Sequence, residues 1–181
     1  MRIVCREGRL ASLLADLAVH RLDMVIADRP MPNHLNVRGF NHFLGERGLT
    51  FFGAPQLLAT LTRKFPALLN QAPFLLPGED VAIRTRLLQW FDEQNIRPRI
   101  VGEFDDSALL NSFGQTGTGL FVAPTATADY LCEQYRVRAI GSINEVKEQL
   151  YAITTERHLQ HPAVLAVSKA AQEEVFGAGA D

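Results

Sequence analysis

The sequence has little cysteine, no long apolar run and no leader of the secretory kind. Its two cysteines, Cys5 and Cys132, lie inside apolar runs without CxxC spacing. This excludes a disulfide framework or a zinc site by spacing and predicts buried free thiols in the reducing cytoplasm. The apolar runs are far shorter than the roughly 20 residues that cross a bilayer, so no membrane partner is expected. The first residues, MRIVCREGRLASLL, lack the basic segment, apolar core and cleavage site of a signal peptide.

An excess of positive charge is also missing. Lysine and arginine total 18, aspartate and glutamate total 20, and the formal net charge is -2. A chain that binds nucleic acid directly shows a basic patch or stripe. Nucleic acid is therefore not expected as a direct partner of this chain.

Catalytic and cofactor motifs are lacking as well. Ser12, Ser107 and Ser112 have no histidine and aspartate arranged to activate them. The segment GQTGTG at 114–119 precedes a predicted strand and has no Lys-Ser/Thr ending, so it predicts a turn that ends a helix rather than a phosphate loop. We expect neither an enzyme nor a bound cofactor or metal.

What the sequence does contain is a regular alternation of strand-like and helix-like segments. Its 181 residues, 47% of them hydrophobic, suffice for one domain or two small lobes. Apolar runs predict strands at 2–7, 22–27, 37–43, 49–54, 74–76, 99–104, 120–123, 137–140 and 149–154. Helical spacing predicts helices at 9–21, 56–70, 83–95, 108–113, 127–134 and 162–176. This order predicts an α/β fold with parallel sheets flanked by helices, including a parallel unit over 2–27, and ligands at the carboxyl ends of strands.

Four stretches carry a family resemblance when taken in order. They are HRLDMVIADRPMP (20–32), FLGERGLTFFGAP (43–55), GEDVAIRTRLLQWFDEQNIRP (78–98) and LLNSFGQTGTGLFVAPTATADYL (109–131). Together they resemble the effector-binding domain of LysR-type transcriptional regulators, in which a helix ends in G-x-G before a strand that stops at a proline. Gly117, Gly119 and Pro124 match that pattern. The amino-acid sequence of these stretches is most similar to that of activators of sodium/proton antiporter genes. This similarity implies a response to sodium or pH.

The resemblance implies two lobes of the periplasmic-binding-protein type with a small effector, sodium or a small anion, between them. It places lobe one at 1–36 and 124–181 and lobe two at 37–123, with the Pro-rich segment at 28–36 as the first crossing. It also implies self-association as a dimer or tetramer, and DNA contact only through a helix-turn-helix ahead of this domain. A family domain normally opens with a further strand and helix that this sequence does not contain, so lobe one is expected to be incomplete, swapped or rearranged.

Several polar residues near strand ends are candidate effector contacts. The family places a ligand-facing polar residue where Asp105 stands, and the alternative role, capping the next helix, falls to Asp106 or Ser107. Glu79 and Asp80 resemble an oxygen-rich cation pocket, but acidic residues ahead of a helix also favour its dipole, and two carboxylates do not specify a metal.

Three further candidates have equally ordinary explanations. Gly8 and Arg9 match a ligand loop of the family but also fit a solvated turn, and Thr125 either lines the cleft or caps the next helix. Two other interpretations of the whole chain stay open: a solute-binding protein of a transport system, which shares the fold, and a truncated fragment without a competent cleft.

Overall fold

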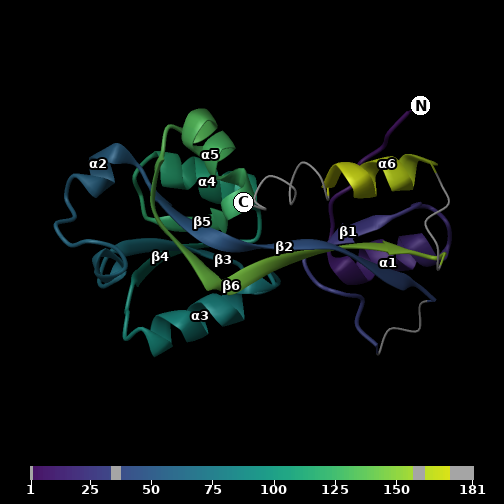
Figure 1. Cartoon of the computed structure of the whole chain (residues 1–181), viewed down its shortest axis with the longest axis horizontal. Helices are drawn as coiled ribbons and strands as arrows, with labels where there is room; N and C mark the ends of the chain where they lie inside the picture. Colours follow the sequence, from purple (N-terminus) through teal and green to yellow (C-terminus); the bar gives the residue numbers. More distant parts are fainter. Residues whose placement is uncertain (1, 34–37, 157–161, 172–181) are drawn as a thin grey trace. The chain divides into compact units, whose positions relative to one another are not determined.

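The computed structural model describes residues 2–33, 38–156 and 162–171, and helices and strands alternate along them (Figure 1). The strands are β1 Val25–Ala27, β2 Phe40–Gly53, β3 Pro73–Pro77, β4 Arg99–Phe104, β5 Phe121–Pro124 and β6 Arg138–Thr154. The α-helices are α1 Leu10–Ala18, α2 Pro55–Leu58, α3 Ile83–Glu93, α4 Ser107–Gln115, α5 Ala128–Tyr135 and α6 Pro162–Ala170, and the 3-10 turns are η1 Ala67–Leu69 and η2 Thr125–Thr127. Residue 37 of the predicted strand at 37–43 and residues 172–176 of the predicted last helix lie outside the described residues.

The chain forms two compact units, each described here by itself. Unit 1 comprises 1–45 and 149–181, and unit 2 comprises 46–148, so the long strands β2 and β6 each pass from one unit to the other. The lobe bounds expected from the family resemblance include residues 124–148 in lobe one. The structure includes this segment in unit 2. The reason is packing, because Leu131 and Val137 share a buried cluster with Phe52 and Phe121.

In unit 1, α1 packs on β1, and β1 pairs antiparallel with β6, matching Val25 with Ile153. The predicted strand at 2–7 does not form, and the predicted parallel pairing over 2–27 is therefore wrong. Ile3 and Val4 are 65% and 61% exposed, and no described strand pairs with them. β-branched residues favour a strand only where a neighbour covers them. Cys5, predicted to be buried, is exposed with them, and Cys132 is half-buried.

The strands of unit 2 include a parallel set. β4 pairs in parallel with β3, and β5 runs parallel to β3 through the bridge between Phe74 and Leu120. The Leu75 amide donates to the Leu120 carbonyl at 2.8 Å, and the Leu120 amide donates to the Pro73 carbonyl at 2.8 Å. On its other side β5 pairs antiparallel with β2. The carboxyl ends of β3, β4 and β5 therefore share one edge.

Helices cover both faces of these strands, with α3 on one side and α4 and α5 on the other (Figure 1). Successive strand residues point to opposite faces, and the buried clusters follow that rule. The cluster on the α3 side contains Leu49, Phe51, Phe74, Leu76, Leu87, Phe91, Leu120 and Val122. The cluster on the α4 side contains Phe52, Leu75, Leu110, Phe121, Ala123 and Leu131.

Two local predictions differ from the structure. The helix predicted at 56–70 ends at Leu58. Pro66 prevents a continuous helix up to residue 70, because proline cannot donate a helical hydrogen bond and disfavours a helical residue before it. Residues 40–43 and 49–53, from segments predicted as separate strands, belong to the single strand β2, and residues 138–140 and 149–154 likewise belong to the single strand β6. Gly48 does not mark a turn: a Cβ there would lie 2.4 Å from the Asn144 side chain and the Ile143 carbonyl, so glycine permits the close approach of β6.

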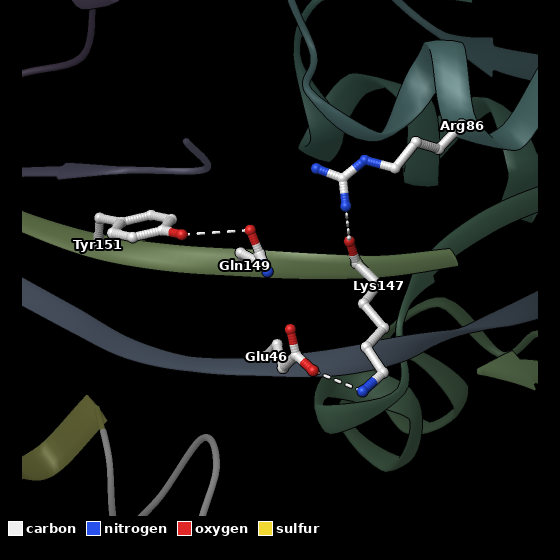
Figure 2. Close-up of polar contacts among 5 residues, drawn as sticks. All are labelled: Glu46, Arg86, Lys147, Gln149 and Tyr151. Carbon is white, nitrogen blue, oxygen red and sulfur yellow. Dashed lines mark hydrogen bonds and ion pairs between the residues drawn. The ribbon is translucent and has the colours of Figure 1, made fainter. Parts of the chain in front are cut away.

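The part of β6 that belongs to unit 2 is held from two sides. Lys147 pairs with Glu46 of β2 at 2.5 Å, and the Arg86 side chain of α3 donates to the Lys147 carbonyl at 3.2 Å (Figure 2). In unit 1, the Tyr151 hydroxyl donates to the Gln149 side chain at 3.2 Å (Figure 2). The contacts of Lys147 hold β6 against α3 and β2.

Candidate functional site

Four of the six predicted site residues follow the parallel strands of unit 2. Glu79 and Asp80 come after β3, Asp105 comes after β4, and Thr125 comes after β5. Because the three strands run in parallel, these residues leave the sheet at the same edge, where α/β folds bind ligands.

Asp105 lies directly over Gly78. The Gly78 amide donates to the Phe104 carbonyl at 2.7 Å, and a Cβ on Gly78 would fall 1.8 Å from Asp105 Oδ1. The loop after β3 and the loop after β4 are therefore in contact, which brings Asp105 close to the start of the segment that carries Glu79 and Asp80. All three acidic side chains belong to exposed residues.

Asp105 is not needed to cap the following helix. The neighbouring Asp106 is the N-cap of α4 and accepts a hydrogen bond from the Leu109 amide at 2.6 Å. This agrees with the prediction that Asp106 or Ser107 caps the helix, while a ligand-facing role of Asp105 stays a prediction.

Arg84 is a residue of this edge that the sequence analysis did not single out. Its side chain, 16% exposed, donates both to the Pro77 carbonyl and to Glu103 Oε2, each at 2.7 Å. It therefore ties the first turn of α3 to the end of β3 and to β4. A basic residue about one turn after an acidic pair is common in helices. The spacing of Arg84 after Glu79 and Asp80 therefore did not indicate that Arg84 joins α3 to β3 and β4.

Charge at this edge is mainly negative. Among residues 77–84 and 103–107 the acidic side chains are Glu79, Asp80, Glu103, Asp105 and Asp106, and the only basic one is Arg84. Within the described residues, no three histidine, cysteine or acidic side chains are grouped so that they could hold a metal ion. The edge is thus an oxygen-rich surface with one embedded guanidinium.

Thr125 belongs to a chain of hydroxyl groups. Its Oγ1 lies 3.0 Å from Thr50 Oγ1, which lies 2.8 Å from Ser142 Oγ. Thr50 is 2% exposed, so its hydroxyl depends on these partners. The sequence analysis missed Thr50 and Ser142, although a polar residue between Leu49 and Phe51 in a buried strand was a usable signal.

Gly8 and Arg9 lie in unit 1, apart in sequence and unit from the other candidates. Arg9 precedes α1, and its carbonyl accepts hydrogen bonds from the Ser12 and Leu13 amides at 3.0 and 3.1 Å. The space beside Gly8 is ordinary, since a Cβ there would lie 3.5 Å from Leu13.

Solved structures of other proteins share this fold. The QuiR effector-binding domain in complex with shikimate matches with a TM-score of 0.65 and 18% identity, covering 94% of this chain and 80% of that one. DarR of Vibrio fischeri in complex with DNA matches with a TM-score of 0.69 and 16% identity, covering 92% and 56%. The α/β, periplasmic-binding-protein-like fold class is thereby confirmed.

Comparison of the amino-acid sequence with known families and proteins identifies the family of this chain. The LysR substrate binding domain family matches residues 1–175, and the chain belongs to this family. The transcriptional activator protein NhaR of Escherichia coli strain K12 is 37% identical over 163 residues, covering 88% of this chain and 52% of that protein. The chain thus spans about half the length of the curated relatives it matches. Within the described residues no helix is both long and apolar enough to cross a membrane.

Proposed function

We propose that this chain is the effector-sensing and self-associating domain of a cytoplasmic LysR-type transcriptional activator, and that its effector binds at the carboxyl ends of β3, β4 and β5. One observation carries the proposal: the polar residues Glu79, Asp80, Asp105 and Thr125 follow three parallel strands at one edge of unit 2. Gly8 and Arg9 of unit 1 remain separate candidate contacts.

The proposed effector is a sodium ion or a small anion. Carboxylate and hydroxyl oxygens suit a hard cation, and Glu79, Asp80, Asp105 and Thr125 supply such groups. An anion would instead use Arg84, the basic side chain of this edge. Sodium is the first choice because of the similarity to NhaR and the resemblance to activators of antiporter genes.

The regulated gene is proposed to encode a sodium/proton antiporter, and DNA is contacted by a helix-turn-helix outside this chain. The net charge of -2 supports this division, because the chain offers no excess of positive charge to phosphates. Copies of the domain are proposed to associate as a dimer or tetramer. An effector then acts by binding two arrangements of the assembly with different affinity.

Thermal unfolding of the 181-residue chain tests the effector. Sodium chloride is compared with potassium chloride at equal ionic strength, followed by a series of small carboxylates. A ligand that binds only the native state at 100 times its Kd adds about 2.7 kcal/mol to the free energy of unfolding. We expect one additive to raise the midpoint in a saturable way.

Variants locate the effect. Asp105→Asn keeps the size of the side chain over Gly78 but removes its charge, and we expect it to abolish the shift. Asp23→Asn, at an exposed position in unit 1, is the matched control and should keep it. A cooperative transition whose midpoint responds to no additive would instead identify a folded domain without a competent site.

A further inference from the structure

A cavity lies within unit 2, distinct from the strand-end edge. Its volume is about 540 Å³, within the range of small-molecule sites. The lining comes from the segment after α2, the C-terminal end of α3 and the middle of β6. The side chains that matter for its chemistry are Phe65, Trp90, Gln94, Ser142, Asn144 and Glu145.

Two aromatic rings form the apolar part of this cavity. Phe65 and Trp90 both pack on the buried ring of Phe51, with centroid separations of 5.4 and 5.7 Å. Gly141 lets Phe65 approach β6, because a Cβ there would lie 2.4 Å from that ring. The aromatic surface therefore continues the hydrophobic core and is held in place before any ligand arrives.

The polar part of the cavity carries a negative charge. Glu145 is exposed, and its Oε2 accepts a hydrogen bond from the Asn144 amide at 2.9 Å. Within the described residues Glu145 forms no ion pair, while the nearest basic residue along β6, Lys147, is paired with Glu46. An unpaired carboxylate beside aromatic rings favours a cation.

Trp90 is largely covered by the core. The residue is 4% exposed, and its indole Nε1, itself buried, has no hydrogen-bond partner among the described residues. A buried donor without a partner is unfavourable.

We propose that this cavity binds a small organic cation of about the size of a trimethylammonium group. Glu145 supplies the counter-charge, and Phe65 and Trp90 supply the aromatic surfaces. Aromatic rings attract organic cations through their negative faces, most strongly when water is excluded, and tryptophan is the best of them. The wide, mixed surface suits a partly dehydrated alkylammonium better than a metal ion, which prefers several oxygen ligands.

Intrinsic fluorescence tests this proposal directly, because Trp90 is the only tryptophan in the chain. Choline chloride is titrated into the 181-residue protein at constant ionic strength, with potassium chloride as the balancing salt. We expect a saturable change in emission with a Kd below about 10 mM. The neutral isostere 3,3-dimethylbutan-1-ol should give no saturable change, because it has the same shape without the charge.

Matched variants assign the charge. Glu145→Gln should weaken choline binding by up to roughly fivefold, because an exposed ion pair contributes little, whereas Glu133→Gln, an exposed position on α5 outside the cavity, should leave it unchanged. The single indole N–H signal in a proton–nitrogen correlation spectrum gives an independent readout and should move with choline, while circular dichroism verifies that each variant folds. No saturable response up to about 100 mM choline, an equal response to the isostere, or unchanged affinity in Glu145→Gln would overturn the proposal.

Discussion

The Asp105 carboxylate occupies the space that a side chain at Gly78 would need, with Asp105 Oδ1 1.8 Å from the position of a Cβ there. The contact joins the ends of two neighbouring parallel strands, since residue 78 follows β3 and residue 105 follows β4. A glycine at this position therefore helps to determine where a proposed effector contact lies.

Gly78→Ala should destabilise the domain and displace Asp105. The loop must move to relieve the contact, and overpacking of this kind typically costs about 1–3 kcal/mol. The free energy of unfolding from denaturant titration measures the effect. Gly8→Ala is the matched control, because its Cβ would meet Leu13 at an ordinary 3.5 Å. Equal stability of the two variants would contradict the close packing of Asp105 on Gly78.

Arg84→Met should cost more stability than the same change at an exposed ion pair. The substitution leaves the Pro77 carbonyl and Glu103 without the donor that now lies 2.7 Å from each, and such a loss costs about 1–3 kcal/mol. Arg97→Met is the comparison, because Arg97 and Asp92 are 70% and 66% exposed, and pairs of this kind contribute about 0–1 kcal/mol. Denaturant unfolding of both variants decides the order. A larger loss in Arg97→Met would show that Arg84 does not anchor this edge.

The isolated 181-residue chain should not bind promoter DNA. Affinity for DNA depends largely on basic side chains that neutralise phosphates and release counterions, and this chain has a net charge of -2. Fluorescence anisotropy with a labelled antiporter promoter fragment, measured at about 50 and 200 mM salt, gives the test, with a scrambled fragment as control. Tight, sequence-specific and salt-dependent binding by this chain alone would contradict the assignment of DNA contacts to another segment.

Local patterns predicted much of the secondary structure correctly. Helical spacing of apolar residues identified α1, α3, α4 and α5, and apolar runs identified β3, β4 and β5. Asp106 was one of two candidates for the cap of α4 and is the cap in the structure. These helices, strands and the helix cap depend on residues within a few positions of one another. Their physical cause can therefore be recognised in the amino-acid sequence.

Features that depend on distant partners were predicted less well. Ile3 and Val4 have the composition of a strand but pair with no described strand, whereas β2 continues through Gly48 because Asn144, far away in sequence, packs against it. Likewise, the apolar residues whose spacing predicted a helix at 56–70 pack in or against the core, although most of them do not form a helix: Leu57, Leu58, Leu61, Phe65 and Leu68. Hydrophobic spacing indicates which side chains are buried more reliably than it indicates the backbone that buries them.

The candidate sites also combine features that depend on local sequence with features that depend on contacts between distant segments. The sequence by itself determined the family resemblance, the alternation of strands and helices, and the polar residues that follow strand ends, because each depends on residue order and local chemistry. Only the tertiary structure decided that β3, β4 and β5 share one edge, that Arg84 joins Pro77 to Glu103, and that Phe65, Trp90 and Glu145 line a common cavity. These relationships arise from strand pairing and core packing between distant segments, and such long-range contacts leave no fixed spacing in a single sequence.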